Sequence, residues 1–566
     1  VGSVDLDTIK MFHLGEEIAI KVMPGEGIIF YGEAIESKYT ADNVYWLTYG
    51  GAAGLRMPLV DGTPGDAVVP ESHRSIVHYE EDHMNRSQVE GDDDLDRYLW
   101  DYLTHLSPRN SWSYEFQLDN RHAGGLTLRL ALAGYYQEIM VNPDHRAGIF
   151  INGSQVGDVS WDGFSRLLTE IDVPDDLLLE GANLLQITSL PTGYSLELFY
   201  IDWFEVEYEQ TYNADSGRLN FSYYLPGDWK FVGTEFGTED VDVFDVTDPL
   251  LVREVANVQV NPAGSSFSAV YEDTITDSKA YAALDSNVYL SAFEVEKDTP
   301  SDLGSASNGA AYLMIAHAAF LETAEQLQAQ KTAQGLRTEL VEVQDIYDQF
   351  GFGIVDIYAI RGFLAYAYSN WVAPAPSYVL MVGDGHFDPR NNEGFGRTSF
   401  IPPFLAFSDL KMGETASDNR YAAIVGNDNM PDLMLGRLSV NTTAEAEAFI
   451  NKIIAYENNP PEGDWKHQVL AVTDRLEVGA NFPSISDSLL RDYLPSEPFG
   501  AERVYFKWTH MDLEEARAAI IAAFNSGKFL VNYIGHAAYI YWGNDNLFEI
   551  RTILTLDPQD KLPIVI

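Results

Sequence analysis

The chain has 566 residues, 46% of them hydrophobic, and its 35 Lys and Arg against 86 Asp and Glu give a net charge of −51. This acidic charge excludes the classes of protein that bind nucleic acid or anionic lipid through a basic face. The chain contains no cysteine, which excludes disulfides, thiolate metal sites and a cysteine nucleophile within it. No apolar run reaches the ~18 residues of a membrane-spanning helix, and we expect no redox cofactor.

Residues 1 to about 305 carry the pattern of β structure. Short runs that alternate apolar and polar residues are separated by Gly, Pro, Asn and Asp clusters roughly every 8–12 residues, as in β sandwiches. This region divides near an acidic stretch, residues 80–96, and again near Tyr212. The acidic stretch is interpreted as a solvated connecting loop, with a calcium loop as the alternative. The sequence therefore predicts three β modules, over residues 1–80, 81–212 and 213–305.

The middle module is predicted to be a jelly-roll-like sandwich. Its β pattern over about residues 113–208, with Trp161 and Tyr194 expected to be exposed, resembles carbohydrate-binding modules. Such a resemblance in fold does not establish function. Sugar binding and a plain structural or prodomain role both remain open.

After residue 305 the hydrophobic period changes. Continuous apolar strands alternate with amphipathic helices, which is typical of a parallel sheet covered on both faces. We predict two α/β subdomains, over residues 306–462 and 463–566. The predicted strands include AYLMIAH (311–317), SYVLMVGD (377–384), HQVLAVTD (467–474), FLVNYIGH (529–536) and LPIVI (562–566).

Residues suited to chemistry stand where three of these strands end. Asp384, Asp474 and His536 each close a strand, and in parallel sheets functional groups gather at the carboxyl ends. A histidine there is suited to acid–base work, and a carboxylate on a neighbouring strand can orient its imidazole. Position alone leaves both a catalytic and a structural role open for His536 and for Asp474.

Four segments, in chain order, resemble the gingipain family of cysteine endopeptidases, and together they cover about residues 308–566. The N-terminal β region is similar to the non-catalytic leader of many relatives. The resemblance implies all-β modules followed by a caspase-like α/β sandwich with a mostly parallel sheet. The segments are SYVLMVGDGHFDP, SDNRYAAIVGNDNMPDLMLGRLSV, EAFINKIIAYE and FLVNYIGHAAYIYWG.

The resemblance also implies roles for individual residues. His536 matches the catalytic base, Asp474 matches the acidic residue that orients it, and the N–H of Ala537 matches an oxyanion-hole donor where the family commonly has glycine. A preference for Arg or Lys substrates is not implied. Asp487 is the nearest acidic candidate for a pocket that would accept a basic substrate residue.

The nucleophile of the family lies a few residues beyond the strand that follows the histidine. LPIVI looks like that strand, and the sequence stops there. We therefore expect these residues to be inactive alone, and a missing C-terminal segment or another chain to complete the domain. A transpeptidase of the same family is a close variant of this reading. The alternatives are a non-catalytic surface or appendage protein and a free-standing carbohydrate-binding protein.

A structural calcium site is the last expectation. By itself the segment VGNDNMPD is a solvated acidic turn with alternating oxygen donors, which suit Ca²⁺. The resemblance implies that Asp384, Asp428 and Asp432 bind calcium together with the carbonyls of Val425 and Met430. It further implies a protein or peptide substrate and an extracellular or cell-surface location.

Overall fold

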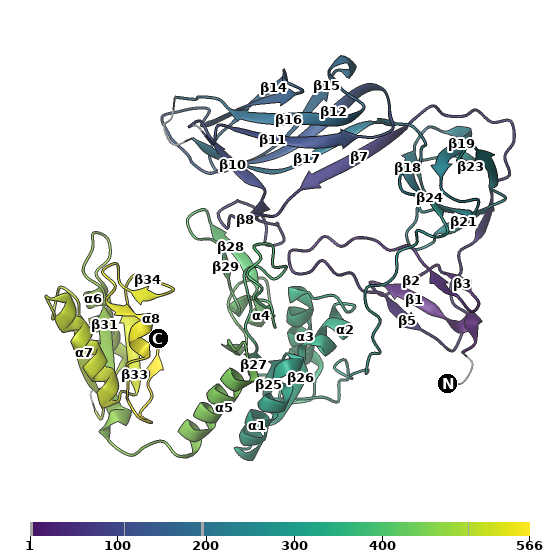
Figure 1. Cartoon of the computed structure of the whole chain (residues 1–566). Helices are drawn as coiled ribbons and strands as arrows, with labels where there is room; N and C mark the ends of the chain where they lie inside the picture. The colour runs from purple at the N-terminus through teal and green to yellow at the C-terminus, as the bar shows by residue number, and fades with distance from the viewer. Residues whose placement is uncertain (1–3, 107, 194–196, 496) are drawn as a thin grey trace. The chain divides into compact units, whose positions relative to one another are not determined.

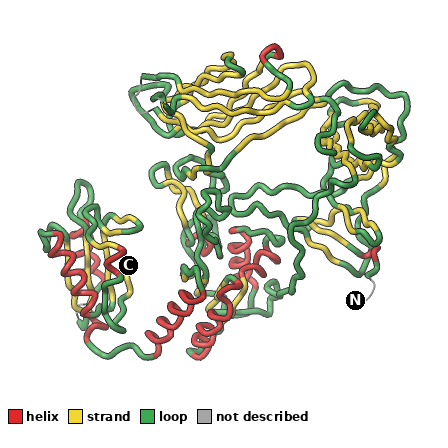
Figure 2. The backbone as a smooth tube through the Cα atoms, viewed as in Figure 1, coloured by secondary structure: helices red, strands yellow, loops and turns green. Residues whose placement is uncertain are grey.

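The structure is a computed structural model that describes residues 4–106, 108–193, 197–495 and 497–566. It contains two compact units, residues 1–446 (unit 1) and 447–566 (unit 2). Among the described residues, α-helices occur only from Leu321 onward, and strands account for most of the regular structure before it (Figures 1 and 2). The short red segments that Figure 2 shows earlier in the chain are single 3-10 turns, such as Leu6–Thr8 and Asp175–Leu177. The predicted order of β-rich modules followed by an α/β region is confirmed. The finer module boundaries stay predictions.

Two small antiparallel sheets open unit 1. β1 pairs with β2 and β5, and β3 pairs with β4. Met11, Ile18 and Ile20 form a small core beneath them. The strands span Lys10–His13 (β1), Glu16–Ile18 (β2), Lys21–Met23 (β3), Gly27–Ile29 (β4) and Trp46–Thr48 (β5).

A ten-stranded sheet runs through the whole β-rich region. Its path is β15-β12-β17-β7-β18-β24-β20-β21-β6, and β10 pairs with β17 beside it. The sheet takes strands from all three predicted β modules, so these modules share one hydrogen-bonded framework. Its strands span Leu59–Asp61 (β6), His73–Glu80 (β7), Asp101–Thr104 (β10), Arg121–Gly134 (β12), Arg166–Val173 (β15), Leu198–Gln210 (β17), Arg218–Tyr223 (β18), Val241–Asp245 (β20), Arg253–Ala256 (β21) and Lys279–Asp285 (β24).

Two further sheets build cores against parts of this framework. One has the order β11-β16-β13-β14, and alternate residues of its strands join a core that includes Leu128, Ile149, Ile187 and Phe204. The other has the order β19-β23-β22 around Phe231. These strands span Ser111–Leu118 (β11), His145–Ile151 (β13), Ser154–Trp161 (β14), Gly181–Ser189 (β16), Gly227–Phe236 (β19), Gln259–Ala263 (β22) and Ser266–Ile275 (β23).

Trp161 corrects one expectation about the middle module. The residue is only 7% exposed, and its ring packs on His145 and Phe199. The expectation of an exposed Trp161 is therefore wrong, because this ring belongs to the core of the sandwich. Tyr194, the other expected aromatic, lies outside the described residues. The jelly-roll topology and sugar binding stay predictions.

The acidic stretch 80–96 packs on the α/β region of unit 1 and is not a freely solvated loop. Oδ1 of Asp93 accepts a hydrogen bond from the N–H of Phe407 (2.9 Å), and Oδ1 of Asp94 accepts one from the hydroxyl of Tyr358 (3.0 Å). Arg97, just beyond the stretch, donates to backbone carbonyls within it. Two short strands flank these contacts, Met84–Asn85 (β8) and Tyr98–Leu99 (β9).

The α/β region of unit 1 holds a parallel sheet of order β26-β25-β27-β30. Continuous apolar strands fit this position because both faces are covered, and helix residues such as Ile360 and Phe363 pack on it. The elements span Tyr312–Ala316 (β25), Leu321–Ala333 (α1), Thr338–Glu342 (β26), Val343–Phe350 (α2), Ile357–Asn370 (α3), Tyr378–Val382 (β27), Leu405–Asp409 (β28), Gly413–Ala416 (β29), Asn419–Ala422 (α4) and Met434–Leu438 (β30). Helix α5, Thr443–Asn458, spans the boundary between the two units.

Unit 2 repeats this plan with a parallel sheet of order β32-β31-β33-β37. Helix α7 begins where Asp512 accepts hydrogen bonds from the N–H groups of Glu514 and Glu515, and it ends at Gly527, whose φ is 87°. The elements span Gln468–Thr473 (β31), Phe482–Tyr493 (α6), Gly500–Tyr505 (β32), Leu513–Ser526 (α7), Leu530–Ile534 (β33), Ala537–Ala538 (β34), Tyr541–Trp542 (β35), Phe548–Glu549 (β36), Ile550–Ile553 (α8) and Ile564–Val565 (β37).

This arrangement confirms the predicted caspase-like α/β sandwich with parallel sheets. Within the described part of the chain, no helix combines the length and the apolar character needed to cross a bilayer.

Candidate functional site

The carboxyl ends of β31 and β33 bring Asp474 and His536 together. The two strands are parallel neighbours, and the N–H of Asp474 donates to the carbonyl of Ile534 at 3.2 Å. Nδ1 of His536 lies 3.5 Å from Oδ2 of Asp474. The Asp474 side chain is fully buried, whereas that of His536 is 48% exposed. A buried carboxylate thus faces an imidazole that solvent or a substrate can reach.

The backbone of His536 is held from two sides. Its carbonyl accepts hydrogen bonds from the N–H of Gly543, at 2.7 Å, and from the hydroxyl of Tyr533. The ring of Phe482 stands edge-on to the imidazole, with centroids 5.4 Å apart. These contacts restrict the position of the ring before any ligand binds.

Gly535 explains why glycine precedes the histidine. A Cβ at this position would lie 2.4 Å from the hydroxyl oxygen of Tyr533 and 2.5 Å from Cβ of Asp474. Because both distances are far below van der Waals contact, only glycine allows the end of β33 to approach Asp474 this closely.

Glu477 is a site residue that the sequence reasoning missed. Its Oε2 lies 3.7 Å from the same Nδ1 of His536. Its Oε1 accepts a hydrogen bond from Nδ2 of Asn544 (3.2 Å) and pairs with Nε of Arg475 (3.4 Å). The sequence feature that could have identified Glu477 is its position in the loop that follows β31, three residues after Asp474. Among the described residues, Asp474, Glu477 and His536 are the one group of three His or carboxylate side chains whose ligand atoms all lie within 4.8 Å.

Two other predicted site residues belong to unit 2. Ala537 is exposed and begins β34, directly after His536. Asp487, on α6, accepts hydrogen bonds from Nε of Arg503 (2.8 Å) and from the hydroxyl of Tyr505 (3.0 Å). The bond from Arg503 lowers the pKa of Asp487, so a basic substrate residue would compete with an existing ion pair. The roles of both residues stay predictions.

The five predicted calcium ligands all lie in unit 1. Oδ2 of Asp432 accepts hydrogen bonds from the N–H groups of Ile424 and Val425, both at 2.8 Å, and Oδ1 of Asp428 accepts one from Met430 at 2.9 Å. These bonds close the loop that carries the carbonyls.

The third carboxylate, Asp384, accepts a hydrogen bond from Nδ2 of Asn441 at 3.0 Å. The oxygens of the three carboxylates do not lie within 4.8 Å of one another. The loop offers oxygen donors of the kind Ca²⁺ prefers, and the site stays a prediction.

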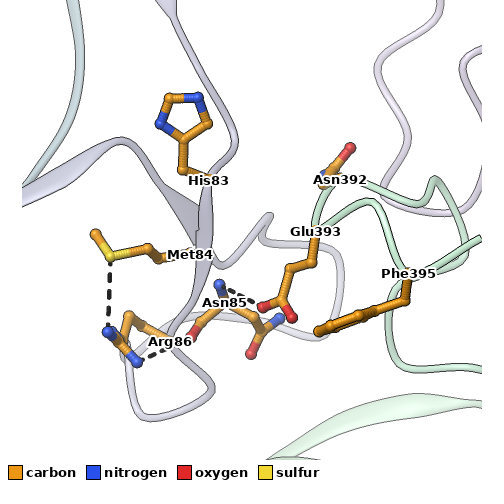
Figure 3. Close-up of a pocket in the computed structure, with 7 residues that line it drawn as sticks. All are labelled: His83, Met84, Asn85, Arg86, Asn392, Glu393 and Phe395. Carbon is orange, nitrogen blue, oxygen red and sulfur yellow. Dashed lines mark hydrogen bonds between the residues drawn. The ribbon is translucent and has the colours of Figure 1, made fainter.

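A cavity of about 500 Å³ in unit 1 contains none of the predicted site residues. The acidic stretch and a loop of the α/β region form its walls, and the N–H of Asn85 donates to Oε1 of Glu393 across it, at 3.3 Å (Figure 3). Its His83 pairs with Glu81 at 3.0 Å, but both side chains are exposed, unlike the buried carboxylate of Asp474. Its lining residues are His83, Met84, Asn85, Arg86, Asn392, Glu393 and Phe395.

Comparison with known sequences finds relatives of the C-terminal region. Residues 305–566 match Peptidase family C25. Gingipain R2 of Porphyromonas gingivalis is 25% identical over 391 residues, which cover 63% of this chain and 45% of that protein. Gingipain R1 of the same species is 28% identical over 244 residues, covering 42% of this chain and 21% of that protein. The chain thus spans less than half the length of these curated relatives.

Comparison with solved structures supports the fold. The dimeric latent PorU from Porphyromonas gingivalis superposes with a TM-score of 0.58 and 18% identity, over 82% of this chain and 48% of that chain. By the sequence matches above, the C-terminal region is gingipain-like. The similarity to PorU also takes in much of the β-rich region that precedes it.

Proposed function

We propose that this chain, whose residues 305–566 match peptidase family C25, is the leader and the base-bearing part of a cysteine endopeptidase. One observation carries the proposal: the half-exposed imidazole of His536 stands 3.5 Å from the buried carboxylate of Asp474. Histidine can accept and return a proton near neutral pH, and a buried carboxylate holds the ring in one orientation. Protein or peptide substrates, and an extracellular or cell-surface location, are part of the proposal.

The nucleophilic thiol comes from outside these 566 residues, because the chain contains no cysteine. The order of strands in unit 2 supports one place for it. β37 pairs in parallel with β33, and the carbonyl of Ile566 accepts a hydrogen bond from the N–H of Tyr533 at 2.8 Å. A residue joined shortly after Ile566 would leave the sheet at the edge where His536 lies.

His536 then performs two proton transfers. It takes the proton of the thiol, and the thiolate attacks the carbonyl carbon of the scissile peptide bond. The resulting oxyanion needs N–H donors, and that of Ala537 is the nearest candidate in sequence. His536 returns a proton to the amine as the C–N bond breaks. Water, deprotonated by the same imidazole, hydrolyses the acyl-enzyme and releases the thiol.

The test compares two lengths of chain. The 566-residue chain should show no labelling by a thiol-directed peptide probe. A chain extended along its natural sequence through the next cysteine should be labelled. His536→Ala in the extended chain should abolish labelling, while His510→Ala, a histidine of unit 2 that bonds to Thr509, should not. A correctly folded extended chain that resists labelling would favour the alternative of a non-catalytic surface protein. A natural sequence that provides no cysteine for such an extension would favour the same alternative.

A further inference from the structure

The side chains of Asp474, Glu477 and His536 lie close enough together to hold a metal ion. Nδ1 of His536 is 3.5 Å from Oδ2 of Asp474 and 3.7 Å from Oε2 of Glu477. In a tetrahedral zinc site with bonds of 2.0–2.1 Å, neighbouring ligand atoms stand about 3.3 Å apart. The two separations from Nδ1 are within a few tenths of an ångström of that edge, and the ligand atoms of all three residues lie within 4.8 Å of one another.

Each carboxylate is also oriented by a second set of contacts. Oδ1 of Asp474 accepts a hydrogen bond from the N–H of Arg475 at 2.7 Å, and Oδ2, which faces the imidazole, accepts a longer one from the N–H of Asn544 at 3.4 Å. Oε1 of Glu477 is held by Asn544 and Arg475, which leaves Oε2 directed at the imidazole. Such outer contacts are the usual support of metal ligands.

The donor set selects the class of metal. Calcium and magnesium prefer oxygen ligands alone, whereas one imidazole with two carboxylates suits zinc and neighbouring transition metals. The half-exposed His536 leaves solvent access on one side, so a water molecule can fill the fourth position.

His78, in unit 1, shows that two nearby carboxylates are not sufficient. Its Nδ1 lies 3.2 Å from Glu205 and its Nε2 lies 3.2 Å from Glu80. Because these carboxylates face different ring nitrogens, the three groups cannot converge on a single ion. At His536 both carboxylates face the same nitrogen.

We propose that Asp474, Glu477 and His536 bind one zinc-class divalent ion, and that the ion blocks the base by occupying Nδ1. The binding itself stands on the geometry of the three side chains, and only its inhibitory effect rests on the proposed peptidase function. With the ion bound, the metal replaces the carboxylate contacts of Nδ1. The imidazole of His536 can then no longer accept the proton of the thiol.

Metal binding is measured on the untagged 566-residue chain after treatment with a chelator. We expect one equivalent of Co²⁺ to give the visible absorption of a tetrahedral site and Zn²⁺ to displace it. His536→Ala and Glu477→Gln should each weaken Zn²⁺ binding in calorimetry at least tenfold, and the matched variant His78→Ala should leave it unchanged. Glu477→Gln decides the outcome if His536→Ala does not fold. Absence of saturable binding, or binding insensitive to both site variants, would overturn the proposal.

A second measurement separates this proposal from the function. In the extended chain with its thiol, Zn²⁺ should prevent labelling by the peptide probe, and a chelator should restore it. Zinc binding without any labelling in metal-free buffer would refute the peptidase function and leave the metal site standing. Labelling that persists at saturating zinc would refute the inhibitory role.

Discussion

Arg97 and Glu414 form a buried ion pair across 317 residues of sequence. Nη1 of Arg97 lies 2.7 Å from Oε1 of Glu414, with the two side chains 1% and 6% exposed. Lys38 pairs with the same oxygen at 2.5 Å. One carboxylate on the hairpin β28–β29 therefore pairs with two cations of the N-terminal region, and it joins that region to the α/β part of unit 1.

Glu414→Gln should strongly destabilise unit 1. The substitution leaves two buried cations without their counter-charge, and breaking a buried pair of this kind costs about 3–5 kcal/mol. Urea unfolding followed by tryptophan fluorescence measures the effect as a lower midpoint. Glu170→Gln, which removes an exposed partner of Arg129, is the matched control and should change stability by less than about 0.5 kcal/mol. Equal midpoints for the two variants would contradict the argument.

Glu197 should make stability depend on pH. Burial raises the pKa of this carboxyl to about 7, and its Oε2 has no protein hydrogen-bond partner, with Nδ1 of His105 at 4.0 Å. Since the folded pKa exceeds the unfolded one, the stabilisation is complete below about pH 4.5 and is lost as the pH rises through about 7.

Glu197→Gln tests this dependence because it keeps the shape and removes the charge. The variant should be more stable than the parent at pH 8 by about 1–3 kcal/mol, and the two should converge at pH 5. Thermal unfolding across this pH range measures the difference. A variant that is less stable than the parent at pH 8 would show that the ionised carboxylate stabilises the fold.

Asp474 and Glu477 should contribute unequally to catalysis in the extended chain. Asp474 is fully buried and Glu477 is partly exposed and paired with Arg475, so Asp474 should hold the imidazole more firmly. We expect Asp474→Asn to lower kcat by about 10²–10⁴-fold, in line with the loss of the orienting carboxylate in other triads. Glu477→Gln should lower it by about tenfold or less. The reverse order in steady-state kinetics would assign the orienting role to Glu477.

Calcium should stabilise unit 1 if the predicted ligands act together. EDTA should then lower the melting temperature, and added Ca²⁺ should restore it. Asp428→Asn should remove this response. Asp409→Asn is the matched control, because Asp409 accepts hydrogen bonds from the N–H groups of Lys411 and Met412 in a similar turn outside the predicted set. A melting temperature that changes with neither EDTA nor Ca²⁺ would count against the site.

Hydrophobic period was enough to predict the order of modules, and it placed Asp474 and His536 at the ends of strands; the pairing of the two side chains was implied by the resemblance to the gingipain family. The reason is local: continuous apolar strands alternating with helices form parallel sheets, whose carboxyl ends share one edge. The burial of Trp161 could not be predicted in the same way. An alternating strand has two faces, and the sequence does not say which face meets another sheet.

The amino-acid sequence alone thus determined the class of fold, the strongly acidic charge, the absence of a thiol and the places of Asp474 and His536 at strand ends, because composition and periodicity are properties of neighbouring residues. Only the tertiary structure decided that Glu477 also faces Nδ1 of His536, that Asp487 is already paired with Arg503, and that Glu414 pairs with both Lys38 and Arg97. Each of these contacts joins residues from separate loops, strands or helices, and their distances depend on how those elements pack rather than on any pattern within one of them.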